Sequence, residues 1–298
     1  AVQAVVVTGV QDLLGDDTLW QAVGTQVMTW AQQLPTDTFL LTTIQNEVAT
    51  GVREQLGGPL GDVAGPLVGQ AVYGLLADPA VVEGLAQGLI TLIGTFRTDT
   101  DAADAVAQAA GAGAAAFIAT AVLFGADPLK AAEQAAGQVL ANSTGFADGV
   151  SGSVSAAVTV VLGNTALWTA VDTQVSELVS GLLAAPVVRT AIGDAVATAI
   201  SGGELGPAAV VGRLAGDLVT DLLAAPQVQQ ALAALPVVFS GLFTPAVVDA
   251  VAAVAGAVAA GQLSAAEGAR QLEGDAAVQQ AVQAVVVTGV QDLLGDDT

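Results

Sequence analysis

The chain has 298 residues, with 6 Lys and Arg, 28 Asp and Glu, no Cys and no His, so its net charge is −22. Without Cys and His, disulfides are excluded, as are zinc and haem sites with those ligands and Cys–His or Ser–His–Asp catalysis. Six dispersed cations also argue against nucleic-acid binding, because they cannot neutralise a run of phosphates.

The apolar composition excludes a disordered chain and predicts a core of small side chains. Hydrophobic residues make up 53% of the sequence, but aromatic residues only 4%. A core of Ala, Val, Leu and Gly has little side-chain volume, so neighbouring helix backbones are expected to approach closely.

The first predicted element recurs at the end of the chain. The string AVQAVVVTGVQDLLGDDT occupies residues 1–18 and again residues 281–298, which defines a period of 280 residues. In the second copy it is preceded by EGDAAVQQ, which continues the same helical pattern, whereas AVVVTGV alone favours a strand by propensity. We therefore expect a helix that is already under way at Ala1, and a chain that is a window on a longer tandem array.

The period divides into two half-repeats. Residues 10–27 align with 158–175, and the offset of 148 falls to 147 and 145 further along the chain. It then drops to 134, which places an eleven-residue gap near 117–127. The sequence thus predicts a first half-repeat at 1–148, a second at 149–280, and the start of the next copy at 281–298.

Variants of one junction separate the apolar runs, among them LLGDDTLW, LLADPAVV and VLGNTALW. Asp and Asn accept hydrogen bonds from the free N–H groups at a helix start, so these junctions predict helix caps. The aspartates expected to act as caps are Asp16, Asp17, Asp78, Asp99, Asp127 and Asp275. Between junctions the apolar spacing is three to four residues, as at Val188, Ile192, Val196 and Ile200.

These patterns predict an all-α fold. We expect about fourteen helices of roughly 12–20 residues, because apolar runs of that length recur between the junctions. Short junctions favour antiparallel neighbours, and tandem helices of this kind stack as a solenoid or rod.

One acidic cluster is a candidate calcium site. Asp99, Asp101 and Asp104 lie within six residues, and calcium prefers clustered carboxylates, but no following Gly and Glu complete an EF-hand loop. Capping is the alternative interpretation for these acids. No other metal site, no catalytic residue and no cofactor site is predicted. Trp20 and Trp168 occupy equivalent half-repeat positions and are interpreted as packing anchors.

A membrane interpretation rests on the uncharged stretch from Ala105 to Ala126, which is long enough to span a bilayer. It is mostly Ala and Gly, and no Lys or Arg cluster orients it, so we expect it to pack inside a bundle.

The phrase LLADPAVVEGLA, in an Ala- and Val-rich chain with one lysine, resembles repetitive regions of large exported proteins of high-GC actinobacteria, of the mycobacterial type. This resemblance implies an extracellular or cell-surface location. We expect a structural, non-enzymatic segment of a stalk, fibre or filament whose partner is itself, with no small-molecule substrate. The alternatives are an α-solenoid that binds a protein partner and an envelope or membrane-associated protein.

Overall fold

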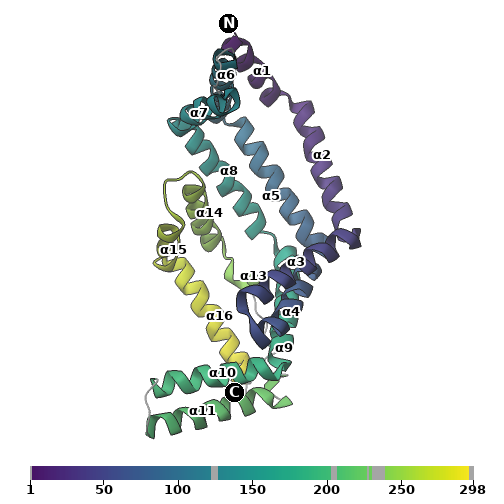
Figure 1. Ribbon diagram of the computed structural model, residues 1–298, viewed down its shortest axis with the longest axis vertical. Coiled ribbons are helices and arrows are strands. Elements are labelled where there is room, and N and C mark those ends of the chain that lie inside the picture. The colour runs from purple at the N-terminus through teal and green to yellow at the C-terminus, as the bar shows by residue number, and fades with distance from the viewer. Residues whose placement is uncertain (1, 122–126, 203–206, 227, 230–238, 295–298) are drawn as a thin grey trace. The chain divides into compact units, whose positions relative to one another are not determined.

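The computed structural model describes residues 2–121, 127–202, 207–226, 228–229 and 239–294 (Figure 1). Nearly all of these residues are helical and none of them lies in a strand, which confirms the all-α fold class. The AVVVTGV part of the repeated string is helical in both places, in α1 (Val2–Gly15) and in α16 (Ala276–Leu294). The strand alternative for AVVVTGV is therefore wrong, while the solenoid and its 280-residue period stay predictions.

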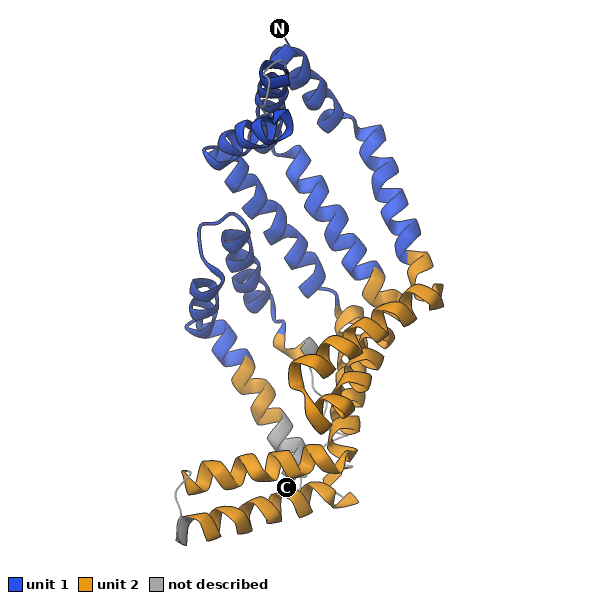
Figure 2. Cartoon of the chain, viewed as in Figure 1, with its two compact units in different colours: residues 1–31, 83–164, 243–281 blue, residues 32–82, 165–242, 282–298 orange. Residues whose placement is uncertain are grey.

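The chain forms two compact units, and each takes segments from both predicted half-repeats (Figure 2). Unit 1 comprises residues 1–31, 83–164 and 243–281. Unit 2 comprises residues 32–82, 165–242 and 282–298. The half-repeats at 1–148 and 149–280 are thus defined by sequence alignment, and the compact units do not follow their boundaries.

In unit 1 the central helix is α6 (Thr100–Ala121), which packs against α1, α7 and α8. Ala102 and Ala107 of α6 are completely buried. The helix α8 packs in turn against α14, and α14 against α15. The other helices that belong wholly or mostly to unit 1 are α2 (Asp17–Gln33), α5 (Pro79–Thr98), α7 (Pro128–Ala141), α8 (Thr144–Leu162), α14 (Pro245–Ala259) and α15 (Ala265–Glu273).

Unit 2 is built from two helical hairpins, α3–α4 and α10–α11, with α9 in contact with both. The turn between α3 and α4 contains Gly57 and Gly58, whose φ angles of 65° and 52° strain other residues. The elements of unit 2 are η1 (Leu34–Thr36), α3 (Thr38–Leu56), α4 (Gly58–Ala77), α9 (Thr165–Ala184), α10 (Pro186–Ser201), α11 (Pro207–Ala224) and α13 (Phe239–Leu242).

Aspartates cap many of the helices, as the junction pattern predicts. Their Oδ1 atoms accept hydrogen bonds of 2.8–3.2 Å from backbone N–H groups two or three residues further on. These capping residues are Asp16, Asp78, Asp99, Asp127 and Asp275. The prediction for Asp17 is wrong, because this residue lies in the first turn of α2 and its carboxylate pairs with Arg97 at 2.6 Å.

The predicted eleven-residue gap falls on the end of α6. That helix continues to Ala121, whereas its counterpart α14 ends at Ala259, which aligns with Ala114. The described part of the excess is therefore an extension of α6, and residues 122–126 lie outside the described residues.

Candidate self-association surfaces

Two carboxylates of the candidate calcium cluster, those of Asp99 and Asp104, make hydrogen bonds within the protein. Asp99 caps α6 by accepting from the backbone N–H groups of Asp101 and Ala102, at 3.1 and 2.9 Å. Asp104 accepts from the side-chain amide of Gln11 at 2.7 Å. Within the part of the chain that the structure describes, no three acidic side chains are grouped so that they could hold a metal ion.

A polar depression of about 400 Å³ lies beside this cluster, where α6 approaches the junction of α7 and α8. Three of its polar side chains have partners, and one of them is Asp104, paired with Gln11. Asn142 donates from its side-chain amide to the carbonyl of Gln138 at 2.8 Å, and the Ser143 hydroxyl accepts from the N–H of Phe146 at 3.1 Å. These bonds close one helix and start the next, so helix capping explains the positions of Asn142 and Ser143.

Closely packed glycines hold the α3–α4 hairpin together. A Cβ added at Gly65 would lie 2.5 Å from the carbonyl oxygen of Ala49, and one at Gly69 would lie 2.6 Å from that of Gln45. Only glycine allows the two backbones to approach this closely. Gly61 repeats the contact one turn earlier, at 2.6 Å from the carbonyl oxygen of Arg53.

The α10–α11 hairpin repeats this packing at aligned positions. A Cβ at Gly212 would lie 2.5 Å from the carbonyl oxygen of Ala197, and one at Gly216 would lie 2.5 Å from that of Gly193. These four residues align with Gly65, Ala49, Gly69 and Gln45, at offsets of 147 for α4 and 148 for α3. Aligned residues of the two half-repeats thus make the same contacts in unit 2.

The same correspondence holds in unit 1. Gly111 of α6 packs against the carbonyl oxygen of Gln3 in α1, 3.0 Å from an added Cβ. The aligned residue Gly256 of α14 packs against the carbonyl oxygen of Ser151 in α8, at 2.5 Å. The pairs α1–α6 and α8–α14 are therefore equivalent. The four-residue spacing of Gly61, Gly65 and Gly69 is a sequence signal for close contacts between helix backbones. The alignment of the repeats alone does not reveal this signal.

In the interior of unit 1, α8 has a neighbour on each side. Gly149 packs against the side chain of Ala102 in α6, whereas Ser151 packs against Gly256 in α14. Ser153 is only 1% exposed, and its hydroxyl donates to the carbonyl of Gly149 at 2.6 Å. The helices α1 and α16 align with α8 in sequence. The packing of α8 therefore shows which two sides of such a helix can be covered by neighbours.

The two copies of the repeated string expose opposite faces. In α1, Val5 is 73% exposed, whereas Val7 is half-buried against Gly111. In α16 the order is reversed, since Val285 is half-buried and Val287 is 45% exposed. Because these residues are identical in sequence, the difference comes from the surroundings of each copy. In α8 two neighbouring helices cover opposite sides, whereas α1 and α16 each leave a different side exposed.

Several helices meet the length and composition of a membrane span. By those criteria alone, 4 of the described helices could cross a bilayer, namely α4, α5, α6 and α8. The pair α9 and α10, bent by 81°, would bring the number to 5 if counted as one span. The stretch from Ala105 contributes to α6, where Ala105 and Ala109 are buried against protein.

No protein-family model, no curated protein and no solved structure matches the chain.

Proposed function

We propose that the chain is a structural segment of a tandem-repeat α-helical protein whose successive copies pack side by side in an extracellular stalk, fibre or filament. The observation that supports this proposal is the opposite exposure of Val5 and Val7 in α1 and of their copies Val285 and Val287 in α16. The aligned helix α8 is covered on two sides, so a further copy of the period would cover the sides that α1 and α16 leave exposed.

The close glycine contacts support the same proposal, because they give each repeat a fixed geometry. A stack of repeats is regular only if every copy packs against the next in the same way. The matching Gly65–Ala49 and Gly212–Ala197 contacts show that aligned residues in the two half-repeats pack alike. The cell-surface location is proposed from the resemblance of LLADPAVVEGLA to repetitive regions of exported actinobacterial proteins.

The test is a series of chains with one, two and three periods in tandem. We expect particles in electron micrographs to lengthen by a constant increment with each period. We also expect the midpoint of chemical unfolding to rise from one period to three, because each added copy covers faces that were exposed. Particles whose longest dimension does not grow with the number of periods would refute the structural role.

Membrane association is the second candidate, because four helices have the length and composition of spans. Against it, α4 packs through its glycines on α3, which carries the charged residues Glu47, Arg53 and Glu54 on exposed positions. Charged side chains in a bilayer interior are costly. Co-flotation of the chain with liposomes in a density gradient would favour the membrane candidate, and recovery in the protein fraction without detergent would favour the stalk.

A further inference from the structure

The helix α11 carries a stripe of large apolar side chains that are exposed. The stripe consists of Val211, Leu214, Leu218 and Leu222, which are 57%, 64%, 60% and 48% exposed. Another face of the same helix packs on α10 through Gly212 and Gly216. Four large apolar side chains at a spacing of three to four residues are typical of a helix face that packs on another helix.

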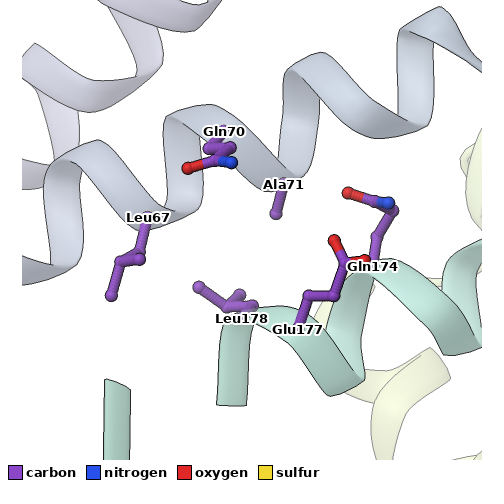
Figure 3. A pocket seen from close by; sticks show the side chains of 6 residues that line it. All are labelled: Leu67, Gln70, Ala71, Gln174, Glu177 and Leu178. Atoms are coloured by element: carbon purple, nitrogen blue, oxygen red, sulfur yellow. The ribbon is translucent and has the colours of Figure 1, made fainter. Parts of the chain in front are cut away.

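The aligned face of α4 is covered. At the offset of 147, the α11 stripe corresponds to Ala64, Leu67, Ala71 and Leu75, all of which are buried or half-buried. The helix α9 lies on this face, and a Cβ added at Gly181 would be 2.9 Å from a methyl group of Leu67. Figure 3 shows Leu67 and Ala71 of α4 opposite Leu178 and Gln174 of α9.

The helix that aligns with α9 is α2, and its corresponding face is exposed. Gln174, Leu178 and Gly181 of α9 are half-buried. At the offset of 148 they correspond to three exposed residues of α2, which are Gln26, Trp30 and Gln33. Trp30 is 53% exposed, which is unusual for a residue of this size. The α4–α9 contact, which joins the first half-repeat to the second, therefore has two exposed counterparts, on α11 and on α2.

We propose that the apolar stripe of α11 binds α2 of the following copy of the 280-residue period, in the arrangement that α4 and α9 adopt within this chain. Leu214 would take the place of Leu67, and Trp30 of the following copy that of Leu178. This inference rests on the proposed function and deepens it, because it names the second surface through which successive copies join.

Two replacements add apolar volume where the internal interface leaves space. Between α4 and α9 there is a gap of about 400 Å³ lined by Leu67, Ala71 and Leu178, among other residues. In the proposed interface Ala71 is replaced by Leu218 and Leu178 by Trp30, and these larger side chains fill the gap. Filling a cavity next to apolar side chains stabilises a contact by restoring lost van der Waals interactions.

Two other replacements change the polar part of the interface. Gly74, which is packed against the side chain of Gln174, is replaced by Asp221, and Gln174 is replaced by Gln26. A Cβ at Gly74 would overlap the side-chain amide of Gln174, so Gln26 must adopt another rotamer beside Asp221, from which its amide can donate a hydrogen bond to the Asp221 carboxylate. Gln33 replaces Gly181, where an added Cβ would lie 2.9 Å from a methyl group of Leu67, so in the proposed interface the methyl groups of Leu214 must shift to make room for the Cβ of Gln33.

Thiol cross-linking tests the proposal cleanly, because the chain has no cysteine of its own. The protein to use is a chain with two periods in tandem, residues 1–280 followed by residues 1–298. Leu214→Cys in the first copy is combined with Gln33→Cys in the second, and a short bifunctional thiol reagent is added. We expect both thiols to be lost and a cross-link to form within one chain. Leu67→Cys with Gly181→Cys in the first copy is the positive control, because that contact is present in the structure.

The matched negative control keeps Leu214→Cys and moves the second cysteine to Gln21, which is exposed on another face of α2. The proposal is overturned if the Gln33 pair reacts no better than the Gln21 pair, or cross-links only between separate chains, while the positive control reacts. Electron micrographs of the same two-period chain separate the two proposals. Lengthened particles without the cross-link overturn only the α11–α2 interface, whereas particles that do not lengthen overturn the structural role.

Discussion

The close approach of α3 and α4 predicts an unusual response to a substitution that normally stabilises helices. Replacing a helical glycine by alanine gains about 1 kcal/mol of helix propensity. At Gly65, however, the new Cβ would lie 2.5 Å from the carbonyl oxygen of Ala49, closer than carbon and oxygen atoms pack. The two helices must separate, and overpacking of this kind costs about 1–3 kcal/mol. We expect Gly65→Ala to be neutral or to destabilise unit 2 by up to about 2 kcal/mol.

Gly51 in α3 is the matched control, because an added Cβ there meets nothing within 4 Å. Gly51→Ala should stabilise by up to about 1 kcal/mol, so the difference between the two variants measures the steric cost alone. Guanidinium unfolding followed by circular dichroism at 222 nm gives both values. Gly212→Ala, at the aligned position of α11, should behave like Gly65→Ala. Equal stabilisation by all three substitutions would refute the close-packing argument.

Three further predictions concern the repeated string and the caps. Val5→Lys should leave the free energy of unfolding within about 0.5 kcal/mol of the parent value, because Val5 is 73% exposed. Val285→Lys should be clearly destabilising, because this copy of Val5 is half-buried. Thermal melts compare the two variants, and equal melting temperatures would contradict the opposite exposed faces of α1 and α16. Asp127→Ala should destabilise α7 by about 1 kcal/mol, because two backbone N–H groups lose their acceptor, and Asp127→Asn should retain most of that stability in chemical unfolding. Ser264 and Glu267 form a capping box at the start of α15, and the hydrogen bonds from Ser264 lower the pKa of Glu267 from its ordinary value of 4.5. The capping box should therefore stabilise α15 fully above about pH 4.5, and this stabilisation should be lost as the pH falls through the lowered pKa. Carboxyl-carbon NMR titration should show that pKa returning towards its ordinary value in Ser264→Ala, and an unchanged titration would exclude the capping box as its cause.

Local features of the fold could be predicted from the sequence, because they depend on residues close together in the chain. The all-α class follows from apolar periodicity, and the caps follow from aspartates at the junctions. Asp17 was predicted wrongly because Asp16, one residue earlier, already supplies the cap, which leaves Asp17 to pair with Arg97, 80 residues away. Nothing local to the junction distinguishes the two acids.

The assignment of helices to compact units could not be predicted from the repeat alignment. Alignment identifies which residues correspond, but not which helices meet, and α1 meets α6 across more than eighty residues of intervening chain. The relevant information lies in the faces of the helices. Gly111 permits contact with Gln3 because it has no Cβ, and which residue it meets depends on how the two helices cross in three dimensions.

The division of each half-repeat between two units bears on how a tandem array could keep its geometry. Within unit 1 the equivalent pairs are α1–α6 and α8–α14, and within unit 2 the equivalent hairpins are α3–α4 and α10–α11. On the proposed function, a following copy joins the preceding one twice, once through the faces of α16 and once through the α11 stripe. Two separate contacts fix the orientation of a neighbour, whereas a single helix–helix contact leaves rotation about its axis free. A chain with Leu214→Asp and Leu218→Asp should therefore retain its own fold, because both residues are exposed. In a two-period chain the same substitutions should broaden the distribution of angles between copies in electron micrographs, and an unchanged distribution would show that α16 alone sets the orientation.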